Sequence, residues 1–267
     1  MSSGSKAVKN TAMITFKNNM ISCIFGGLIL IFTYYSCNLI SSLFYYFKIS
    51  LLGEIVFFLL LFFIFLPMLL GLLRFYWRMI LGVTDKPISV FYNFSDLQKY
   101  KKAIKLQTVF LIKAFVRGIA LFLPVILVKL ISQEYFYDFF GLPMPLWAGN
   151  LLPVFNGLVT FSLVILLFLM LKFYLSPMLY VADENIDVDE AIHMSNIISK
   201  KSGIDFIYLC ASFIGWIILS LLVFPLIFTL PYMLLSYLYH SRFAIAEYNK
   251  HIENQKIDSR FNFSEGI

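Results

Sequence analysis

Residues 55–73 read IVFFLLLFFIFLPMLLGLL, a run without a charged side chain. A helix needs about 20 mainly apolar residues to cross the hydrocarbon core of a bilayer, and this run has that length. The chain as a whole is also strongly apolar: 60% of its 267 residues are hydrophobic and only 13% are charged. Soluble domains carry about 25% charged residues. The sequence therefore predicts an all-α, multi-pass membrane protein.

The same criterion predicts six spans within one transmembrane domain over residues 1–248, followed by a polar cytoplasmic tail over residues 249–267. The spans are expected at about 20–47, 55–73, 106–131, 151–171, 206–224 and 226–241. The last two share one apolar stretch, which as a straight helix would be roughly 60 Å long at about 1.5 Å per residue. The hydrocarbon core is only about 30 Å thick, so the chain must turn back, and Pro225 is the expected turning point.

Positive charge orients these spans. Seventeen of the 21 Lys and Arg residues flank one set of span ends, and only Lys48 and Lys129 flank the other set. Lys and Arg are enriched in cytoplasmic loops, which predicts that both termini are cytoplasmic. The same bias accounts for the net charge of +6, so no nucleic-acid partner is expected.

A short amphipathic helix is expected before each pair of spans. The clearest covers residues 186–201, where Asp187 and Glu190 have capping-box spacing and Gly203 supplies a stop signal. Its apolar residues recur at helical spacing: Ile186, Ala191, Met194, Ile197 and Ile198. Weaker versions cover residues 90–102 and 7–17. The predicted arrangement is three parallel membrane hairpins, each preceded by such a helix.

An internal repeat supports this arrangement. Residues 74–90, RFYWRMILGVTDKPISV, align with residues 172–188, KFYLSPMLYVADENIDV. Seven positions are identical, among them the Phe-Tyr pair and the Asp. The repeat is parallel, whereas many secondary transporters contain inverted repeats.

Motifs in the second half of the chain resemble a known family. They are Asp183, the run Glu190-Ala191-Ile192, Ser195, residues 200–203 (KKSG), residues 212–216 (SFIGW), the pair Pro231-Tyr232, and Tyr239. In this order they resemble a bacterial integral membrane family catalogued as domain-of-unknown-function family 975, and the resemblance covers most of the chain. It implies a plasma-membrane protein of bacteria and names neither an activity nor a catalytic residue.

Two basic residues lie within the third predicted span. Lys113 and Arg117 are four residues apart and so share one helix face. Charges inside spans often mark binding sites or pathways, and these two are the candidate ligand-binding residues. Three interpretations stay open: basic side chains that extend toward lipid headgroups, a site for a substrate or partner, and a structural pair with an acidic residue.

The fifth predicted span contains candidate helix-packing residues. Ala211 and Gly215 have the small-xxx-small spacing that lets another helix approach closely, and Trp216 is expected to face protein. No metal site or cofactor is expected, because the acidic residues of 183–190 fit helix capping and the three cysteines form no CxxC pair.

Recognisable enzyme motifs are absent: there is no HExxH, P-loop or GxSxG sequence. The favoured hypothesis is a non-enzymatic protein that organises membrane lipids or a protein partner, including a second copy of itself, through its amphipathic helices. The alternative is a transporter or permease for a small anionic or amphiphilic compound, with Lys113 and Arg117 along its route.

Overall fold

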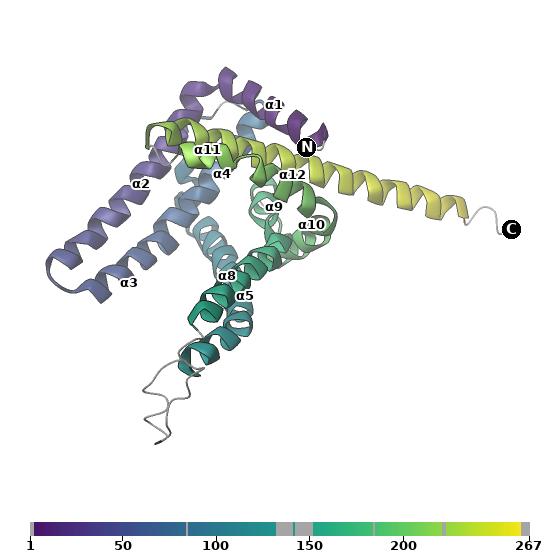
Figure 1. Ribbon diagram of the computed structural model, residues 1–267. Helices are drawn as coiled ribbons and strands as arrows, with labels where there is room; N and C mark the ends of the chain where they lie inside the picture. The colour runs from purple at the N-terminus through teal and green to yellow at the C-terminus, as the bar shows by residue number, and fades with distance from the viewer. Residues whose placement is uncertain are drawn as a thin grey trace. The chain divides into compact units, whose positions relative to one another are not determined.

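The computed structural model describes residues 3–83, 85–131, 141, 152–183, 185–220 and 223–262, and the secondary structure in these ranges is entirely helical (Figure 1). This confirms the all-α class. The elements are α1 Ser3–Asn18, α2 Met20–Tyr46, α3 Ser50–Leu60, the π-helix η1 Leu61–Phe65, α4 Leu66–Ile80, the 3-10 helix η2 Pro87–Phe94, α5 Leu97–Ile131, α8 Leu152–Met170, the 3-10 helix η3 Leu171–Phe173, α9 Ser176–Ala182, α10 Val188–Ala211, α11 Ile214–Leu219 and α12 Val223–Asn262.

Four helical segments of the described chain are long and apolar enough to cross a membrane, which indicates a membrane protein. They are Met20–Phe44, Ser50–Ile80, Leu97–Ile131 and Val154–Ala182. These segments contain most of each of the first four predicted spans. The third begins nine residues before its predicted start, because the basic residues ahead of the apolar run are already helical.

Contacts divide the chain into two compact units, Thr108–Lys172 and the remainder. The smaller unit is an antiparallel hairpin of α5 and α8, in which the Ser162 hydroxyl donates to the Leu121 carbonyl at 3.2 Å. In the larger unit, α2 runs antiparallel to the segment Ser50–Ile80. The Ser41 hydroxyl donates to the Gly53 carbonyl at 2.8 Å, and the Tyr76 hydroxyl donates to the Cys23 carbonyl at 2.7 Å.

The fifth and sixth predicted spans are not confirmed, and their helix boundaries differ from the prediction. Helix α10 runs through Gly203 to Ala211, so Gly203 does not stop it. A turn at Ser212–Phe213 then separates α10 from the short α11. Pro225 is not the turning point, because it lies in the first turn of α12, where the missing N–H of proline costs nothing. Helix α12 continues to Asn262 and so includes most of the predicted tail.

Two of the predicted amphipathic helices, residues 186–201 and 7–17, turn part of their apolar faces toward the protein. Ile186, Ala191 and Ile198 pack in a buried cluster with Leu175, Leu179 and Ala244. In α1 the buried residues are Ser5, Ala12 and Phe16, whereas Ile14 is 60% exposed. Helix α1 lies along α12, and Thr15 and Tyr239 share a hydrogen bond of 2.6 Å.

The second predicted amphipathic helix, residues 90–102, does not form as one helix. Its first part is the 3-10 helix η2, and α5 begins afterwards at Leu97. The break falls at Asp96, whose carboxylate accepts the N–H of Gln98 at 3.0 Å. This N-terminal cap starts a new helix. The cap therefore prevails over the apolar periodicity of residues 90–102, which predicted one continuous helix.

A proline interrupts the second span. Pro67 has no N–H for the carbonyl of Phe63, four residues earlier, and the π-helix η1 lies directly before it. The Tyr100 hydroxyl donates to the Phe63 carbonyl at 3.0 Å, and the Asn93 amide donates to the Pro67 carbonyl at 2.8 Å. Two side chains of the following segment therefore bond to carbonyls at the irregular part of the span.

The backbone of η2 lies directly against α4 at Gly71. A Cβ at Gly71 would collide with the Val90 carbonyl oxygen and stand 2.9 Å from its carbon. Val90 itself is fully buried. Glycine is therefore needed here for close approach of two backbones.

We predict that Gly71→Ala destabilises the protein by about 1–3 kcal/mol or more, the usual cost of overpacking a filled site. The thermal unfolding midpoint in detergent should fall by several degrees. Gly203→Ala is the matched control, because nothing lies within 4 Å of its Cβ position and alanine favours a helix by about 1 kcal/mol. Equal midpoints for the two variants would contradict the close-approach argument.

Candidate functional site

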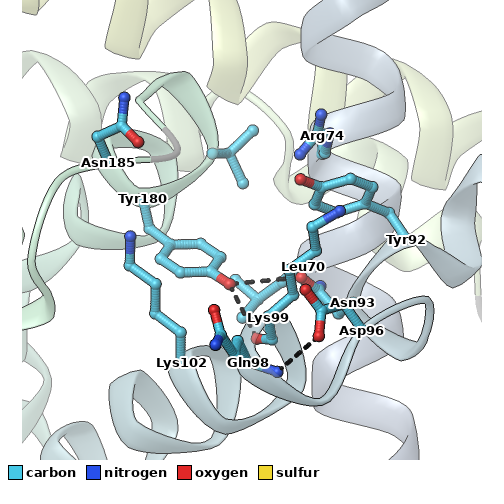
Figure 2. A pocket seen from close by; sticks show the side chains of 11 residues that line it. Leu70, Arg74, Tyr92, Asn93, Asp96, Gln98, Lys99, Lys102, Tyr180 and Asn185 are labelled. Atoms are coloured by element: carbon cyan, nitrogen blue, oxygen red, sulfur yellow. Dashed lines mark hydrogen bonds between the residues drawn. The ribbon is translucent and has the colours of Figure 1, made fainter.

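A cavity of about 350 Å³ opens beside the middle of α4, within the larger unit (Figure 2). We call it the tyrosine cavity. Its lining comes from α4, η2, the first turns of α5, and α9 with the loop after it: Leu70, Arg74, Tyr92, Asn93, Asp96, Gln98, Lys99, Lys102, Tyr180, Val181 and Asn185. Three of these residues are basic and one, Asp96, is acidic, so the described part of the lining carries more positive than negative charge.

The positions of the basic residues follow from the local fold. Arg74 lies one turn after Leu70 on α4, and the Gly71–Val90 contact holds η2, with Tyr92, against that helix. The cap at Asp96 starts α5, so Lys99 and Lys102 fall on consecutive turns of it. Residues distant in sequence therefore line one space.

The cations of the cavity lie over aromatic rings. The Arg74 Cζ is 3.2 Å from the centroid of the Tyr92 ring, and the Lys99 Nζ is 4.0 Å from the same centroid. The Lys102 Nζ is 5.6 Å from the Tyr180 centroid. Each such contact contributes about 0.5–2 kcal/mol. Two like charges at one ring also repel each other, so this arrangement favours a bound anion.

Buried polar groups form the base of the cavity. Asn93 is 2% exposed, and besides its bond to Pro67 its Oδ1 accepts the Tyr180 hydroxyl at 3.4 Å. Figure 2 shows Tyr180 and Tyr92 on opposite sides of the cavity, with Lys102 near the first and Lys99 near the second. The proline of the second span is thus linked through Asn93 to a side chain of α9.

Two further hollows adjoin the tyrosine cavity. One, which we call the adjoining cavity, has a volume of about 310 Å³ and is lined by Arg74, Phe75, Arg78, Asp85, Lys86, Ile88, Ser89 and Tyr92. The other, which we call the apolar groove, has a volume of about 400 Å³ and is lined by Ile88, Ser89, Phe91, Tyr92, Phe94 and Ser95. Shared lining residues place the three hollows next to one another along η2.

The predicted ligand-binding residues lie elsewhere. Lys113 and Arg117 are half-buried on α5 in the smaller unit, and the Arg117 Nη1 lies 3.8 Å from the Met170 sulfur of α8. Neither residue lines the tyrosine cavity. Their shared helix face was predictable from spacing, and that face is turned toward α8 at Arg117.

The predicted helix-packing residues are separated by a turn. Ala211 ends α10, whereas Gly215 and Trp216 belong to α11. Among the described residues, no atom lies within 4 Å of a Cβ built on Gly215. Trp216 is 39% exposed. Its ring packs edge-on against the Tyr232 ring, with 6.0 Å between the two ring centroids.

The acidic residues before α10 pair with a lysine. Asp187 occupies the N-cap position without a side-chain capping bond, and the Lys105 amine lies 3.2 Å from its Oδ1 and 3.0 Å from the Asp189 Oδ2. Lys105, together with neighbouring backbone N–H groups, lowers the pKa of Asp187. In the described ranges, no three His, Cys, Asp or Glu residues converge as metal ligands do.

The chain was compared with protein families, with curated proteins and with solved structures, and no match was found in any of the three. The resemblance to family 975 therefore rests on sequence motifs alone.

We predict that Asn93→Ala lowers stability by about 1–3 kcal/mol, because it leaves buried polar groups without their partner. The unfolding midpoint in detergent measures this loss. Asn185→Ala is the control, since Asn185 lines the same cavity but is exposed. If both variants unfold like the wild type, Asn93 does not stabilise the irregular part of the second span.

Proposed function

We propose that the chain is a non-enzymatic membrane protein that binds an anionic lipid headgroup in the tyrosine cavity and thereby organises lipid, or a partner recruited with it, in the plasma membrane. The convergence of Arg74, Lys99 and Lys102 on Tyr92 and Tyr180 is the observation that carries this proposal. Phosphate oxygens accept several charge-assisted hydrogen bonds at once, which suits a cluster of cations.

The location of the cavity supports a lipid over a free anion. Arg74 lies near the C-terminal end of the Ser50–Ile80 segment, at the depth where headgroups are expected. The apolar groove beside it exposes Ile88, Phe91 and Phe94, which are 66%, 41% and 40% exposed. An acyl chain is the natural occupant of such a surface.

This proposal assigns lipid binding to one of the three predicted amphipathic segments, residues 90–102 with the residues just before it, and not to the other two. Their buried residues pack against α9 and α12 and so are unavailable to a bilayer. The role proposed from the sequence is kept, but the tyrosine cavity and the apolar groove perform it rather than the apolar faces of three helices.

Transport remains the second candidate function. Its support is the half-buried position of Lys113 and Arg117 on α5 and the contact of Arg117 with α8, since intramembrane cations are costly and often functional. The two candidates place their anion on different residues, so one experiment separates them.

We predict that native mass spectrometry of the protein released from nanodiscs will retain phosphatidylglycerol in preference to phosphatidylcholine. Lys99→Gln combined with Lys102→Gln should lower the retained anionic lipid about tenfold or more, because each charged hydrogen bond contributes about 1.5–3 kcal/mol. Lys113→Gln combined with Arg117→Gln removes equal charge and should leave retention unchanged. Loss of lipid in the second variant alone would favour the transport candidate.

For the topology, we propose four crossings with both termini cytoplasmic. Helices α10 and α11 pair with α12 in antiparallel fashion, as the Phe213–Tyr232 ring contact at 5.4 Å indicates. The Lys9 amine donates to the Ser212 carbonyl at 3.3 Å, and Lys9 belongs to the basic N-terminus. From Ser212 to Val223 even a continuous helix extends only roughly 16 Å, about half the hydrocarbon core. This hairpin then lies at the inner face.

We predict that Ser220→Cys, in a Cys210→Ser background, resists a membrane-impermeant maleimide in right-side-out vesicles and reacts once the vesicles are opened. Ser50→Cys should react from outside, and Ser95→Cys only after opening. The six-crossing arrangement predicted from the sequence places position 220 within the fifth span (206–224), near its outer end, where it would either react from outside or stay unlabelled after opening. Labelling of that position in sealed vesicles would establish six crossings.

A further inference from the structure

The adjoining cavity repeats the chemistry of the tyrosine cavity. It contains Arg74, Arg78 and Lys86 against one carboxylate, Asp85. The Arg78 Nε lies 2.7 Å from the Asp85 Oδ2, so these two form an ion pair, and the described lining holds two further cations, Arg74 and Lys86. Arg74 and Tyr92 line both cavities.

A buried hydroxyl adds a second, independent observation. The Ser89 Oγ is shielded from solvent and has no hydrogen-bond partner among the described residues. A buried polar group without a partner costs about 1–3 kcal/mol. Ser89 lines both the adjoining cavity and the apolar groove, so a ligand oxygen in this cavity would supply the missing partner.

The charge of the two cavities together exceeds what one phosphodiester neutralises. Their linings contain five cations, namely Arg74, Arg78, Lys86, Lys99 and Lys102, and two carboxylates, Asp85 and Asp96. Among the described residues of the two linings, cations outnumber carboxylates by three. One phosphodiester carries a single negative charge, whereas a lipid with two phosphates carries at least two.

We propose that the tyrosine cavity and the adjoining cavity are paired subsites for a lipid that carries two phosphate groups. Arg74 lies between the subsites and contacts both phosphates. Lys99 and Lys102 bind the first, and Lys86 with the Ser89 hydroxyl binds the second. The apolar groove, which begins at Ser89, receives the acyl chain. This inference rests on the proposed function and names its lipid class.

Competition in nanodiscs tests the inference. Phosphatidylglycerol, with one phosphate, and cardiolipin, with two, are mixed with phosphatidylcholine at equal total phosphate, and retained lipid is counted by native mass spectrometry. The wild type should prefer cardiolipin about tenfold. Lys86→Gln combined with Ser89→Ala should reduce that preference to near unity and leave phosphatidylglycerol retention intact. Lys101→Gln is the charge-matched control, since Lys101 is exposed and lines neither cavity.

The outcomes separate the two proposals. Equal retention of both anionic lipids, with loss of both on Lys99→Gln, overturns the two-phosphate inference and keeps the proposed function. A cardiolipin preference that survives the Lys86 and Ser89 substitutions also overturns the inference. If neither anionic lipid is retained over phosphatidylcholine, the proposed function fails and the inference fails with it.

Discussion

The contact between Gly71 and Val90 is the constraint on which the cavities depend. Because Gly71 has no side chain, the backbone of η2 reaches α4 at van der Waals distance. A larger residue would push η2 away, and with it Tyr92, the ring on which Arg74 and Lys99 meet. Interiors are packed too densely to absorb such a shift locally. The basic cluster therefore exists because one position inside a very apolar span is a glycine.

Pro67 couples the same region to the membrane span. A proline inside a helix frees a carbonyl four residues earlier, and an unsatisfied carbonyl in lipid costs several kcal/mol. Here the carbonyls of Phe63 and Pro67 accept bonds from Tyr100 and Asn93. The segment that lines the site therefore also satisfies the backbone of the span. A change of angle at the proline and a change in the cavity are energetically linked through Asn93, which also binds Tyr180.

Local sequence features predicted the first four long apolar helices but not the candidate site, for a physical reason. Spanning helices follow from the length of charge-free runs, so the first four spans were predictable. Gly203 carries a stop signal, yet α10 continues, because Phe206 beyond it stacks on Tyr174 at 4.1 Å. Arg74 and Lys99 are 25 positions apart, and their meeting at Tyr92 depends on backbone contact at Gly71. Considered separately in the sequence, Arg74 and Lys99 predict only the side of the membrane on which each residue lies.

The same basic residues predict the orientation of the helices in the membrane and form the proposed anion site. Basic residues at cytoplasmic span ends are expected in any helical membrane protein. When such residues lie far apart, they do not indicate a bound ligand. Convergence changes their energy, because cations brought together at the edge of a low-dielectric span repel more strongly than they do in water. Aromatic faces offset part of that repulsion, and Asp85 offsets another part at Arg78. We propose that lipid phosphates, the abundant anions at a membrane surface, contribute to balancing the remainder.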